Sequence, residues 1–594
     1  MTNDIIIYDI EATSDKPHDA IPRVMGFYSS KCGEYQWTTN IKEMVQILNS
    51  HRYIVGYNSD GYDNEVMKKY GFSTFGKISI DLMKIIHGSG FGNDLGRKGI
   101  MMVGKSRLAD LVNSKTMKDT GIALNAPVLK GDIDYNIFKK TWSELTPQEE
   151  EDALTYLKND VDITKHIYEF CEEHAKYFRD GTILLGGVEK PFMTPEWIEK
   201  KKYLTWSTAS MVYHILCNLA NLPAKFSDNT QTQSYEGGFV ALPTQNYAEG
   251  NVYCLDFASL YPHIMIMCNL YGRVDGNGWS GGKLFTTNGV YNDKNLVSVS
   301  NILREIYLER AKRKKMGDKS EYTLKIIINT VYGLLGNPVF ASVHDYISAE
   351  DCTSLGQQFI KYARKKYEEN GYKLLYTDTD SVYLQDPYND YERLMRVTKS
   401  IVDEIKSSVP FPQDTFDMDV DDIIKRIFFF EGVNGQYLKK NYMYVTEDDK
   451  LKIKGLQIIK SNATKLGRVI FDNHIRDKIV KTGEYRFKKS QISEWIRESV
   501  EKDKSLVSNA VRAREYASYK LDSQLQAQIS KNWGEGTWNV VKLNRPHPKG
   551  VGTQSNYIKL EDFGGVSMWW VDLNSTWNEL RHFIEPEKTL FSFI

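Results

Sequence analysis

The sequence has few of the features that mark secreted, zinc-binding or membrane proteins. Its 594 residues include six scattered cysteines with no C-x-x-C pair, which argues for a reducing compartment and against a zinc module or a disulfide framework. No apolar run approaches a membrane span. Residues 5–7 form the only early apolar run and follow Asp4 without a basic region, so no signal peptide is expected. We therefore expect a cytoplasmic protein with no membrane partner.

An excess of charge of one sign is also absent. Lys and Arg number 76 and Asp and Glu number 77, so the net charge does not indicate a polyanionic partner. A local basic groove can still be offset by acidic metal sites elsewhere in the chain. Repeats and low-complexity tracts are missing, and the length predicts about three or four domains.

What the sequence does contain is an acidic turn between two short apolar strands. Residues 374–384 read LLYTDTDSVYL, which predicts a hairpin with Asp378, Thr379 and Asp380 at its tip. Neighbouring carboxylates on an apolar ribbon are unfavourable unless a cation neutralises them, and hard divalent cations take oxygen ligands. A D-x-D sequence taken alone is more often a solvated turn.

A second aspartate stands near the end of another predicted strand. In NVYCLDFASLYPHIMI, residues 252–257 form the strand, Asp256 lies near its end, and Ser259 is placed to cap a helix that tolerates Pro262 in its first turn. Backbone N–H groups at such a helix start can receive phosphate. With Asp380, Asp256 would complete a two-metal site for phosphoryl transfer.

Acidic residues in the first third form a separate set. Asp9 and Glu11 are two apart in the strand-like DIIIYDIEAT and so share one face. Asp63 follows a second apolar strand, and Tyr156 and Asp160 share one face of a predicted helix. The four carboxylates could hold two cations about 3.5–4 Å apart for phosphodiester hydrolysis, with Tyr156 orienting the water. Acidic helix faces are, however, usually just solvated.

Residues 301–336 predict two helices joined by a turn. Each helix has polar residues at helical spacing, so the pair could aim cations at a polyphosphate and a ring at a base. These residues are Arg310 and Lys314 on the first helix and Lys325, Asn329 and Tyr332 on the second. The basic run is alternatively an ordinary solvated face.

Taken in chain order, these motifs resemble those of proofreading DNA polymerases of family B. D-x-E, N-x-x-x-Y-D and Y-x-x-x-D resemble the three exonuclease motifs, while DFASLYP, KIIINTVYG and YTDTDS resemble polymerase motifs A, B and C. IKGLQIIKSNATK resembles a segment of tailed-phage replicative polymerases. The resemblance implies an α/β and α+β multidomain fold, in which an RNase H-like exonuclease domain precedes a right-hand polymerase.

The resemblance also implies domain boundaries. They are 1–190 for the 3′→5′ exonuclease, 191–285 for the first part of the palm, 286–337 for the fingers, 338–466 for the second part of the palm, and 467–594 for the thumb and C-terminal tail. The thumb is expected to be built from helices. The exonuclease would begin almost at residue 1, without the separate N-terminal domain of larger relatives.

Site residues follow from the same resemblance. Asp256 and Asp380 would be the principal ligands of two Mg²⁺ or Mn²⁺ ions, with Asp378 in support, and Tyr261 would be the steric gate against a ribose 2′-OH. Asp9, Glu11, Asp63 and Asp160 would hold two ions in the exonuclease. The triphosphate would meet the backbone N–H groups of Ala258, Ser259 and Leu260 and the side chains of Arg310, Lys314 and Lys325. Lys325 would also act as a general acid, and Asn329 and Tyr332 would pack against the nascent base pair.

The resemblance also implies DNA contacts at several places along the chain. The residues are Asn58, Tyr62, Tyr235, Gly237, Gly238, Lys440, Tyr442 and Lys454. On local sequence alone, SYEGGF is equally an ordinary turn and the strand of Lys454 equally solvent-exposed. Residues 105–112 loosely match a segment that contacts single strands. The tail residues Leu590, Phe591, Phe593 and Ile594 resemble peptides that hold a sliding clamp, or else form a strand tucked into the thumb.

The sequence therefore predicts a DNA-templated polymerase that extends a primer with dNTPs and proofreads, from a phage or mobile element and acting in the host cytoplasm. Short intervals between the polymerase motifs leave little room for the insertions of the protein-primed subgroup. The alternatives are a protein-primed or primer-independent family B polymerase and a dedicated DNA exonuclease. A dedicated exonuclease would leave the acidic residues Asp256, Asp378 and Asp380 unexplained.

Overall fold

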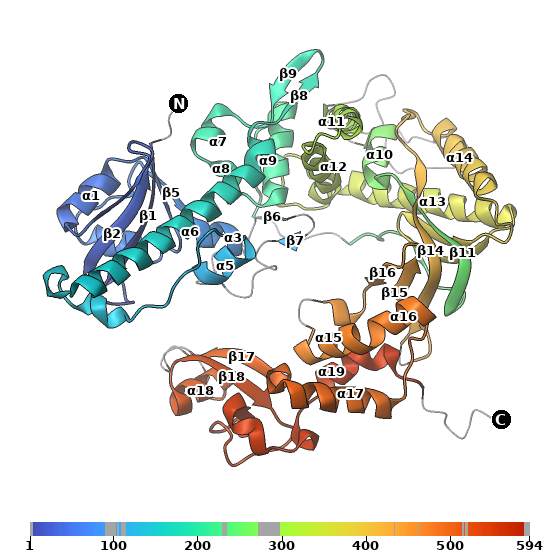
Figure 1. The fold of residues 1–594 in the computed structure, drawn as a ribbon. Helices are drawn as coiled ribbons and strands as arrows, with labels where there is room; N and C mark the ends of the chain where they lie inside the picture. The colour runs from blue at the N-terminus through green and yellow to red at the C-terminus, as the bar shows by residue number, and fades with distance from the viewer. Residues whose placement is uncertain are drawn as a thin grey trace.

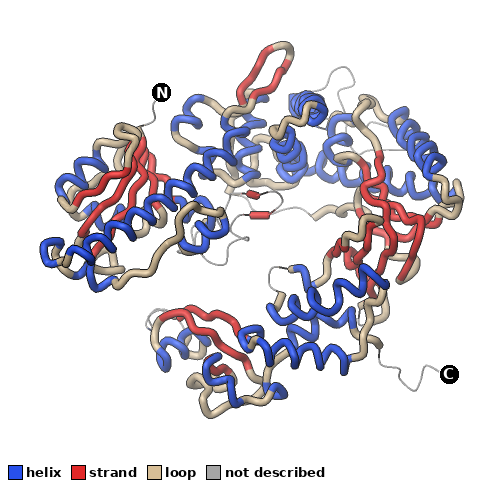
Figure 2. The backbone as a smooth tube through the Cα atoms, viewed as in Figure 1, coloured by secondary structure: helices blue, strands red, loops and turns tan. Residues whose placement is uncertain are grey.

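The computed structural model describes residues 4–88, 102–103, 106–107, 115–228, 234–270, 298–432, 434–460, 463–513, 516, 519 and 521–586. These residues form an open ring (Figure 1). A sheet near the N-terminus and a larger sheet lie at opposite sides, a bank of helices joins them, and the C-terminal part turns back toward the N-terminal part. Figure 2 shows strands gathered in separate places and helices between them. No helix in the described part combines the length and apolar character needed to cross a bilayer.

A five-stranded sheet in the order β3-β2-β1-β4-β5 organises the N-terminal part. Its strands are β1 (Ile5–Ala12), β2 (Pro22–Ser29), β3 (Tyr35–Thr38), β4 (Tyr53–Gly56) and β5 (Ile78–Asp81). β1 runs antiparallel to β2 and parallel to β4, and β4 runs parallel to β5. The continuous apolar run of β1 reflects its central place, because a strand covered on both faces needs apolar residues in succession.

Helices cover this sheet. They are α1 (Ile41–Asn49), α2 (Asp63–Lys68), α3 (Leu82–His87), α5 (Met117–Ala123) and α6 (Pro147–Arg179). α6 begins with a capping box between Thr146 and Glu149 and has Pro147 in its first turn. Its residues Ala153 and Leu157 are fully buried, and the helix lies across the sheet (Figure 1). The helix predicted from the Tyr156–Asp160 spacing is thus confirmed.

A short hairpin, β6 (Met102–Val103) and β7 (Ser106–Arg107), is all that the structure describes of the segment around residues 105–112. The rest of that expected single-strand contact lies outside the described residues.

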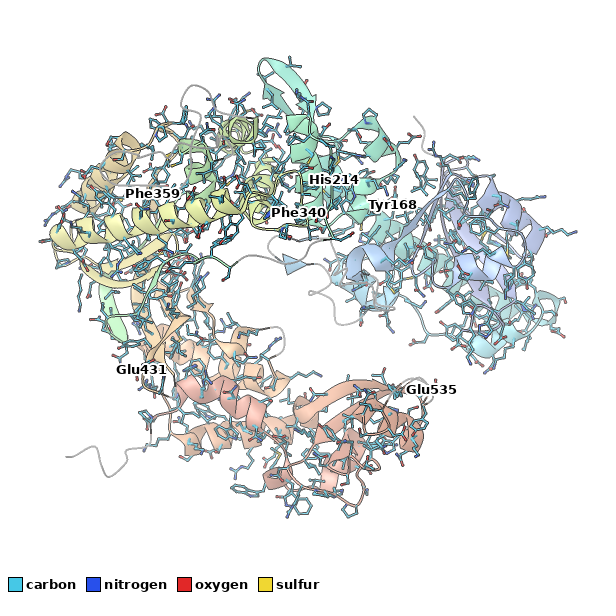
Figure 3. All side chains as sticks on the ribbon, turned by 180° about the vertical axis from the view of Figure 1, so that it is seen from behind. Tyr168, His214, Phe340, Phe359, Glu431 and Glu535 are labelled. Atoms are coloured by element: carbon cyan, nitrogen blue, oxygen red, sulfur yellow. The ribbon has the colours of Figure 1, made fainter. Side chains whose placement is uncertain are left out.

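The chain then passes through helices that connect the two sheets. The elements are β8 (Thr182–Leu185), β9 (Val188–Pro191), α7 (Pro195–Glu199), α8 (Lys202–Thr205) and α9 (Thr208–Ala220). α9 packs against α11 (Ser298–Lys315) and α12 (Glu321–Leu335), which confirms the predicted helix pair. One apolar core continues from α6 into the second sheet and includes Tyr168, Phe340 and Phe359, labelled in Figure 3.

The second sheet has seven strands in the order β10-β12-β13-β11-β14-β15-β16. They are β10 (Val240–Ala241), β11 (Tyr247–Phe257), β12 (Lys373–Asp378), β13 (Ser381–Gln385), β14 (Met418–Glu431), β15 (Tyr437–Thr446) and β16 (Leu451–Lys454), and all neighbours are antiparallel. α13 (Tyr346–Glu369) and α14 (Tyr391–Ser407) pack on it, and α10 (Leu260–Met267) packs against α13. Val382 and Leu384 join the core shared with these helices, whereas Tyr383 joins a tyrosine-rich cluster on the other face.

The core of the C-terminal part continues into β14 and β15, and this part contains a sheet besides the expected helices. Its helices are α15 (Lys465–Ile470), α16 (Arg476–Thr482), α17 (Lys489–Lys502), α18 (Leu525–Trp533) and α19 (Asn574–Leu580). A three-stranded sheet adds β17 (Ser508–Ala513), β18 (Gly536–Lys542) and β19 (Tyr557–Lys559). Figure 3 labels Glu431, at the end of β14, and Glu535, next to β18 at the far tip of this part. The tail from residue 587 onward lies outside the described residues.

Candidate active sites

Three carboxylates of the N-terminal part converge where β1 ends. Ligand oxygens of Asp9, Glu11 and Asp160 lie within 4.8 Å of one another. Asp9 and Glu11 share a face of β1, and Asp160 reaches them from α6, which packs against that strand. All three line a cavity of about 920 Å³, as Asp63 also does. The chain thus places four carboxylates around one cavity, three of them close enough to share a cation.

Burial and mutual repulsion raise the pKa values of these carboxyl groups. Burial, followed by the Asp160 carboxylate, raises the pKa of Asp9 to about 7, against the opposing effect of Lys130. Burial is also the largest cause of the raised pKa values of Glu11, Asp63 and Asp160. One oxygen of Asp160 is buried without a hydrogen-bond partner. Buried, mutually repelling oxygen ligands fit divalent cations such as Mg²⁺ or Mn²⁺.

Lys130 belongs to this site but was missed in the sequence. Its ammonium group pairs with the Asp160 carboxylate and lies 4.8 Å from the centre of the Tyr156 ring. Burial lowers the pKa of Lys130, but Asp160 and Asp9 outweigh it and raise that pKa above its usual range. The residue lies in an irregular segment before α6, so no periodic pattern marks it.

The other residues predicted for this site line the cavity or stand behind it. Asn58, with a φ of 61°, and Tyr62 both line the cavity. Tyr156 was expected to orient the water, but it is 4% exposed and its hydroxyl lies 2.5 Å from that of Tyr135. Tyr135 is the one of the two that lines the cavity. The sequence did not indicate Tyr135, and the water-orienting role of Tyr156 stays a prediction.

In the second sheet, the predicted acidic hairpin is confirmed. Asp378 pairs with Ser381, which leaves Thr379 and Asp380 as a two-residue turn. Thr379 has a φ of 58°, an unfavourable conformation for a β-branched residue. Its N–H donates to the Phe239 carbonyl at 2.8 Å. The segment that contains Phe239 thus holds the strained turn in place and keeps the carboxylates of Asp378 and Asp380 at its tip.

Asp256 lies beside this turn, as predicted. It pairs with Ser381 on β13 and with Asp419 on β14, and the N–H of Phe257 donates to the Asp380 carbonyl at 3.0 Å. Burial, followed by the Asp380 carboxylate, raises the pKa of Asp256 to about 8. Burial also raises the pKa of Asp380. One buried oxygen of Asp256 has no hydrogen-bond partner, so this site also fits hard cations.

Asp421 is a further carboxylate of this site that sequence reasoning missed. It contributes to the raised pKa values of both Asp256 and Asp380. The residue lies on β14, next to β11 in the sheet. Asp421 lies at an irregularity of the pairing between β11 and β14, where Val420 and Asp422 face Leu255 and Cys254, so its position in the sequence gives no signal.

Two lysines predicted to contact DNA lie close to the carboxylates. Lys440 Nζ is 3.0 Å from Asp378 Oδ1, and the charge of Lys454 lowers the pKa of Asp256. Tyr442 is 3% exposed and its hydroxyl lies 2.9 Å from that of Tyr383. Its DNA contact stays a prediction.

The predicted steric gate lies between the hairpin and α12. The Tyr261 ring centre is 4.5 Å from that of Tyr332, and the hydroxyls of Tyr235 and Tyr332 are 3.2 Å apart. A Cβ on Gly238 would lie 2.7 Å from the Thr379 side chain and 3.0 Å from the Tyr261 hydroxyl. Glycine is thus required there because the chain passes directly over the hairpin tip. At Gly237 a Cβ would meet no atom within 4 Å.

Two expectations for the start of α10 are wrong. The Ala258 N–H donates to the Asp417 carbonyl at 2.9 Å, so it is not free to bind a triphosphate. Ser259 stands at the N-cap with a φ of 52°, and its side chain makes no cap hydrogen bond. The sharp turn from β11 into α10 uses this left-handed residue in place of an ordinary cap. The N–H groups of Ser259 and Leu260 stay predicted contacts.

The predicted phosphate-binding side chains of α11 and α12 occupy different environments. Arg310 Nε lies 3.1 Å from the Glu321 carboxylate, an ion pair that ties the two helices together. Lys314 is exposed, and its charge partly offsets the rise that burial and the Asp417 carboxylate give to the pKa of Asp419 on β14. Lys325 is half-buried and Asn329 is exposed. Arg310 therefore already has an anionic partner, which the sequence did not predict.

These features define a multidomain protein with two separate, carboxylate-lined sites, each carried by its own sheet. The sequence profile described as DNA polymerase family B matches residues 197–277 and 301–542, which is more than half of the chain. The chain belongs to DNA polymerase family B.

Relatives by sequence include DNA polymerases of two archaea. The chain is 26% identical over 454 residues to that of Archaeoglobus fulgidus, covering 72% of this chain and 53% of the relative. It is 28% identical over 253 residues to that of Thermococcus gorgonarius, covering 40% of this chain and 31% of the relative. The chain thus spans about half, or less, of the length of these relatives.

A solved structure shares the fold. The family B DNA polymerase from Pyrobaculum calidifontis superposes with a TM-score of 0.54 at 16% identity, covering 98% of this chain and 78% of the other.

The raised pKa values predict that the metal-free protein loses stability as the pH rises. The folded pKa of Asp256, about 8, exceeds its ordinary value of 3.8, so between these values the folded protein retains a proton that the unfolded chain releases. The free energy of unfolding therefore falls through that window. We expect Asp256→Asn to raise the metal-free melting temperature at pH 8 by a few degrees, and to reduce the stabilisation that Mg²⁺ gives the wild type.

Differential scanning calorimetry measures both effects. Asp422→Asn is the matched control, because Asp422 is paired with Lys452 at 2.6 Å and its replacement should lower the melting temperature. A lower metal-free melting temperature for Asp256→Asn would contradict the electrostatic account.

Proposed function

We propose that this chain is a DNA-templated DNA polymerase that extends a primer 3′-OH with dNTPs and proofreads with a 3′→5′ exonuclease, in phage or mobile-element replication in a host cytoplasm. The observation that carries the proposal is the presence of two separate acidic sites in one chain, each at least half-buried. One contains Asp256 and Asp380, and the other contains Asp9, Glu11 and Asp160. A dedicated nuclease would need only the second.

The proposed domains follow the sheets. Residues 1–190 form the RNase H-like exonuclease, 191–285 and 338–466 the palm, 286–337 the fingers, and 467–594 the thumb and tail. The order β3-β2-β1-β4-β5, with β4 and β5 parallel to β1, supports the first assignment. The antiparallel sheet that carries Asp256 and Asp380 supports the second.

In synthesis, the 3′ oxygen of the primer loses its proton to solvent and bonds to the α-phosphorus of the dNTP, while the α–β anhydride bond breaks and pyrophosphate leaves. Asp256 and Asp380, with Asp378 in support, would hold two Mg²⁺ or Mn²⁺ ions, which when bound would lower the pKa of the 3′-OH and neutralise the phosphates. Lys325 donates a proton to the leaving pyrophosphate. Lys440, paired with Asp378, keeps that carboxylate in place.

In proofreading, a water oxygen loses a proton to solvent and bonds to the last phosphorus of the primer, while the bond to the preceding 3′ oxygen breaks and that oxygen takes up a proton. Asp9, Glu11, Asp63 and Asp160 would hold the ions of this site. Lys130 offsets part of the negative charge of the cluster through its ion pair with Asp160. The lining residues Asn58 and Tyr62 contact the frayed end of the strand.

Incubation with Mg²⁺ and a labelled primer on a longer template tests the proposal. Extension with dNTPs and shortening without them are expected. Shortening under both conditions would instead indicate a dedicated nuclease or a polymerase that needs another primer, such as a protein.

Replacement of Tyr261 should relax sugar selection. Its ring is held by Tyr332 and by Gly356, where a Cβ would lie 2.9 Å from the Tyr261 ring. Tyr261→Ala should raise ribonucleotide incorporation relative to deoxynucleotide incorporation by about 10²-fold, measured as the ratio of kcat/KM values. Tyr261→Phe keeps the ring and should keep the selection. Equal ratios for Tyr261→Ala and the wild type would refute the steric role.

The C-terminal peptide with Leu590, Phe591, Phe593 and Ile594 lies outside the described residues, and we propose it as a sliding-clamp contact. Deletion of residues 589–594 should leave distributive synthesis intact and shorten the products made with the cognate clamp. Clamp-dependent product lengths that do not change would rule this role out.

A further inference from the structure

A fully buried histidine stands in the first turn of α10, just beyond the strand that carries Asp256. His263 is 0% exposed, and its ring centre lies 4.3 Å from that of Tyr307 on α11 and 5.5 Å from that of Phe416. α10 packs against α11 and α12 (Figure 1). No step of the proposed synthesis uses the side chain of His263, so the place of this polar ring in the core calls for another reason.

Both ring nitrogens of His263 make hydrogen bonds. Nδ1 lies 2.7 Å from the carbonyl oxygen of Ala258 and 3.2 Å from that of Ser259. Burial lowers the pKa of His263 to about 4, so at neutral pH the ring is uncharged and carries one proton. A carbonyl oxygen can only accept, which assigns that proton to Nδ1. Nε2 therefore accepts from the Thr415 hydroxyl, 3.1 Å away.

The two carbonyls belong to the sharp turn between β11 and α10. Ser259 has a φ of 52° in this turn, and its side chain makes no cap hydrogen bond. A left-handed residue of this kind persists only where its surroundings hold it. The Nδ1–H group of His263 supplies that hold, because it binds the carbonyls of both peptide groups that flank Ser259.

Peptide geometry turns this hold into a direction for two N–H groups. In a trans peptide the C=O and the N–H point in opposite directions, and the described residues contain no cis peptide bond. The carbonyls of Ala258 and Ser259 face the buried ring, so the N–H groups of Ser259 and Leu260 point away from it. Within the described part of the chain neither N–H has a hydrogen-bond partner. The Ala258 N–H differs, because the Asp417 carbonyl accepts it.

We propose that His263 is a positioning residue for the incoming nucleotide, which directs the N–H groups of Ser259 and Leu260 at the triphosphate. This inference rests on the proposed polymerase function. Two adjacent N–H groups at the start of a helix suit phosphate oxygens. The same ring contacts Tyr307, whose own ring centre lies 5.8 Å from the Arg310 guanidinium carbon. His263 thus connects the backbone part of the proposed triphosphate site with the helix that carries its side-chain part.

Steady-state primer extension by the His263→Leu variant tests the proposal. The full-length chain with Asp9→Ala and Glu11→Ala keeps the primer intact. Leucine fills most of the space of the ring but cannot donate, so the KM for dNTP should rise about tenfold. The kcat and the Kd of the primer–template should each change by less than about threefold. Inorganic triphosphate, used as a competitive inhibitor, should bind about tenfold more weakly too, because the two N–H groups contact phosphate and not the base.

A second replacement at the same position separates positioning from packing. The amide N–H of His263→Asn lies close to the place of Nδ1 and can still donate to the Ala258 carbonyl, so its KM for dNTP should stay within about threefold of the wild type. A role in packing alone predicts the larger KM for His263→Asn, because asparagine fills less space than leucine. His214→Leu is the matched control. His214 is also buried and its Nδ1 lies 2.6 Å from the Ser210 carbonyl, but on α9, so its replacement should leave the KM unchanged.

Three results would overturn the positioning role of His263. They are an unchanged KM in His263→Leu, a larger KM in His263→Asn than in His263→Leu, and unchanged binding of inorganic triphosphate. If His263→Leu does not fold, Thr415→Val keeps the ring and removes only the hydroxyl that holds Nε2. Its KM for dNTP should rise about threefold, and an unchanged value would equally refute the role. Failure of the wild type to extend any primer would overturn the polymerase proposal instead.

Discussion

Asp380→Ala is expected to lower primer extension by roughly 10⁴-fold or more, because it removes a ligand from a group of residues that act as a unit. The carboxylate sits on a two-residue turn beside Asp256, and both carboxyl groups have raised pKa values. An alanine there leaves Asp256 without the second ligand that a shared cation needs. Single-turnover extension of a labelled primer measures the loss.

Hydrolysis in the same protein serves as the internal control. The exonuclease cluster lies on a different sheet from Asp380, so shortening of the primer without dNTPs should continue at the wild-type rate within about twofold. Asp380→Asn, which keeps the shape and removes the charge, should behave like the alanine variant. Loss of hydrolysis together with synthesis, in a protein that still folds, would mean that the two sites are not separate.

Asp9→Ala combined with Glu11→Ala should do the reverse and lower hydrolysis by roughly 10⁴-fold. Both side chains belong to the cluster whose ligand oxygens lie within 4.8 Å of one another. Synthesis should remain within about threefold of the wild type, since neither residue contacts the seven-stranded sheet. Degradation of a labelled single strand gives the first rate and primer extension gives the second.

Lys130→Met tests whether the positive charge of Lys130 contributes to hydrolysis, because it leaves all the carboxylate ligands of that cluster in place. It keeps most of the side-chain volume and removes the ion pair with Asp160, so a variant that still binds metal but hydrolyses slowly would show that the ammonium group itself contributes. Unchanged hydrolysis would limit Lys130 to packing.

Much of both sites could be predicted because the relevant residues are close in sequence or at regular spacing. The hairpin at Asp378 and the strand near whose end Asp256 lies have short runs of apolar, β-branched and aromatic residues, and Tyr156 and Asp160 are four apart on one helix. These local signals depend on the backbone geometry of single elements.

What could not be predicted depends on contacts between distant segments. Lys130 reaches Asp160 from an irregular segment, and Asp421 reaches Asp256 through the irregular pairing of β14 with β11. The occupied N–H of Ala258 depends on the carbonyl of Asp417, more than 150 residues later. The secondary-structure propensity of a short segment does not indicate which distant residue that segment will contact.

The C-terminal sheet was missed for a related reason. Its strands β17, β18 and β19 are short and separated by a helix and irregular chain, so helical periodicity dominated the prediction. Pairing between β17 and β18, with Ser508 opposite Val541, is a tertiary contact and has no two-residue turn to mark it.

Extension of a primer with a mismatched 3′ terminus, followed by sequencing of the full-length product, tests the central claim that one chain carries both activities. With Mg²⁺ and all four dNTPs, the wild type should yield full-length product with the mismatch replaced by the correct base, and the Asp9→Ala, Glu11→Ala variant should not. Full-length wild-type product that retains the mismatch would contradict proofreading, and shortened product alone would contradict synthesis.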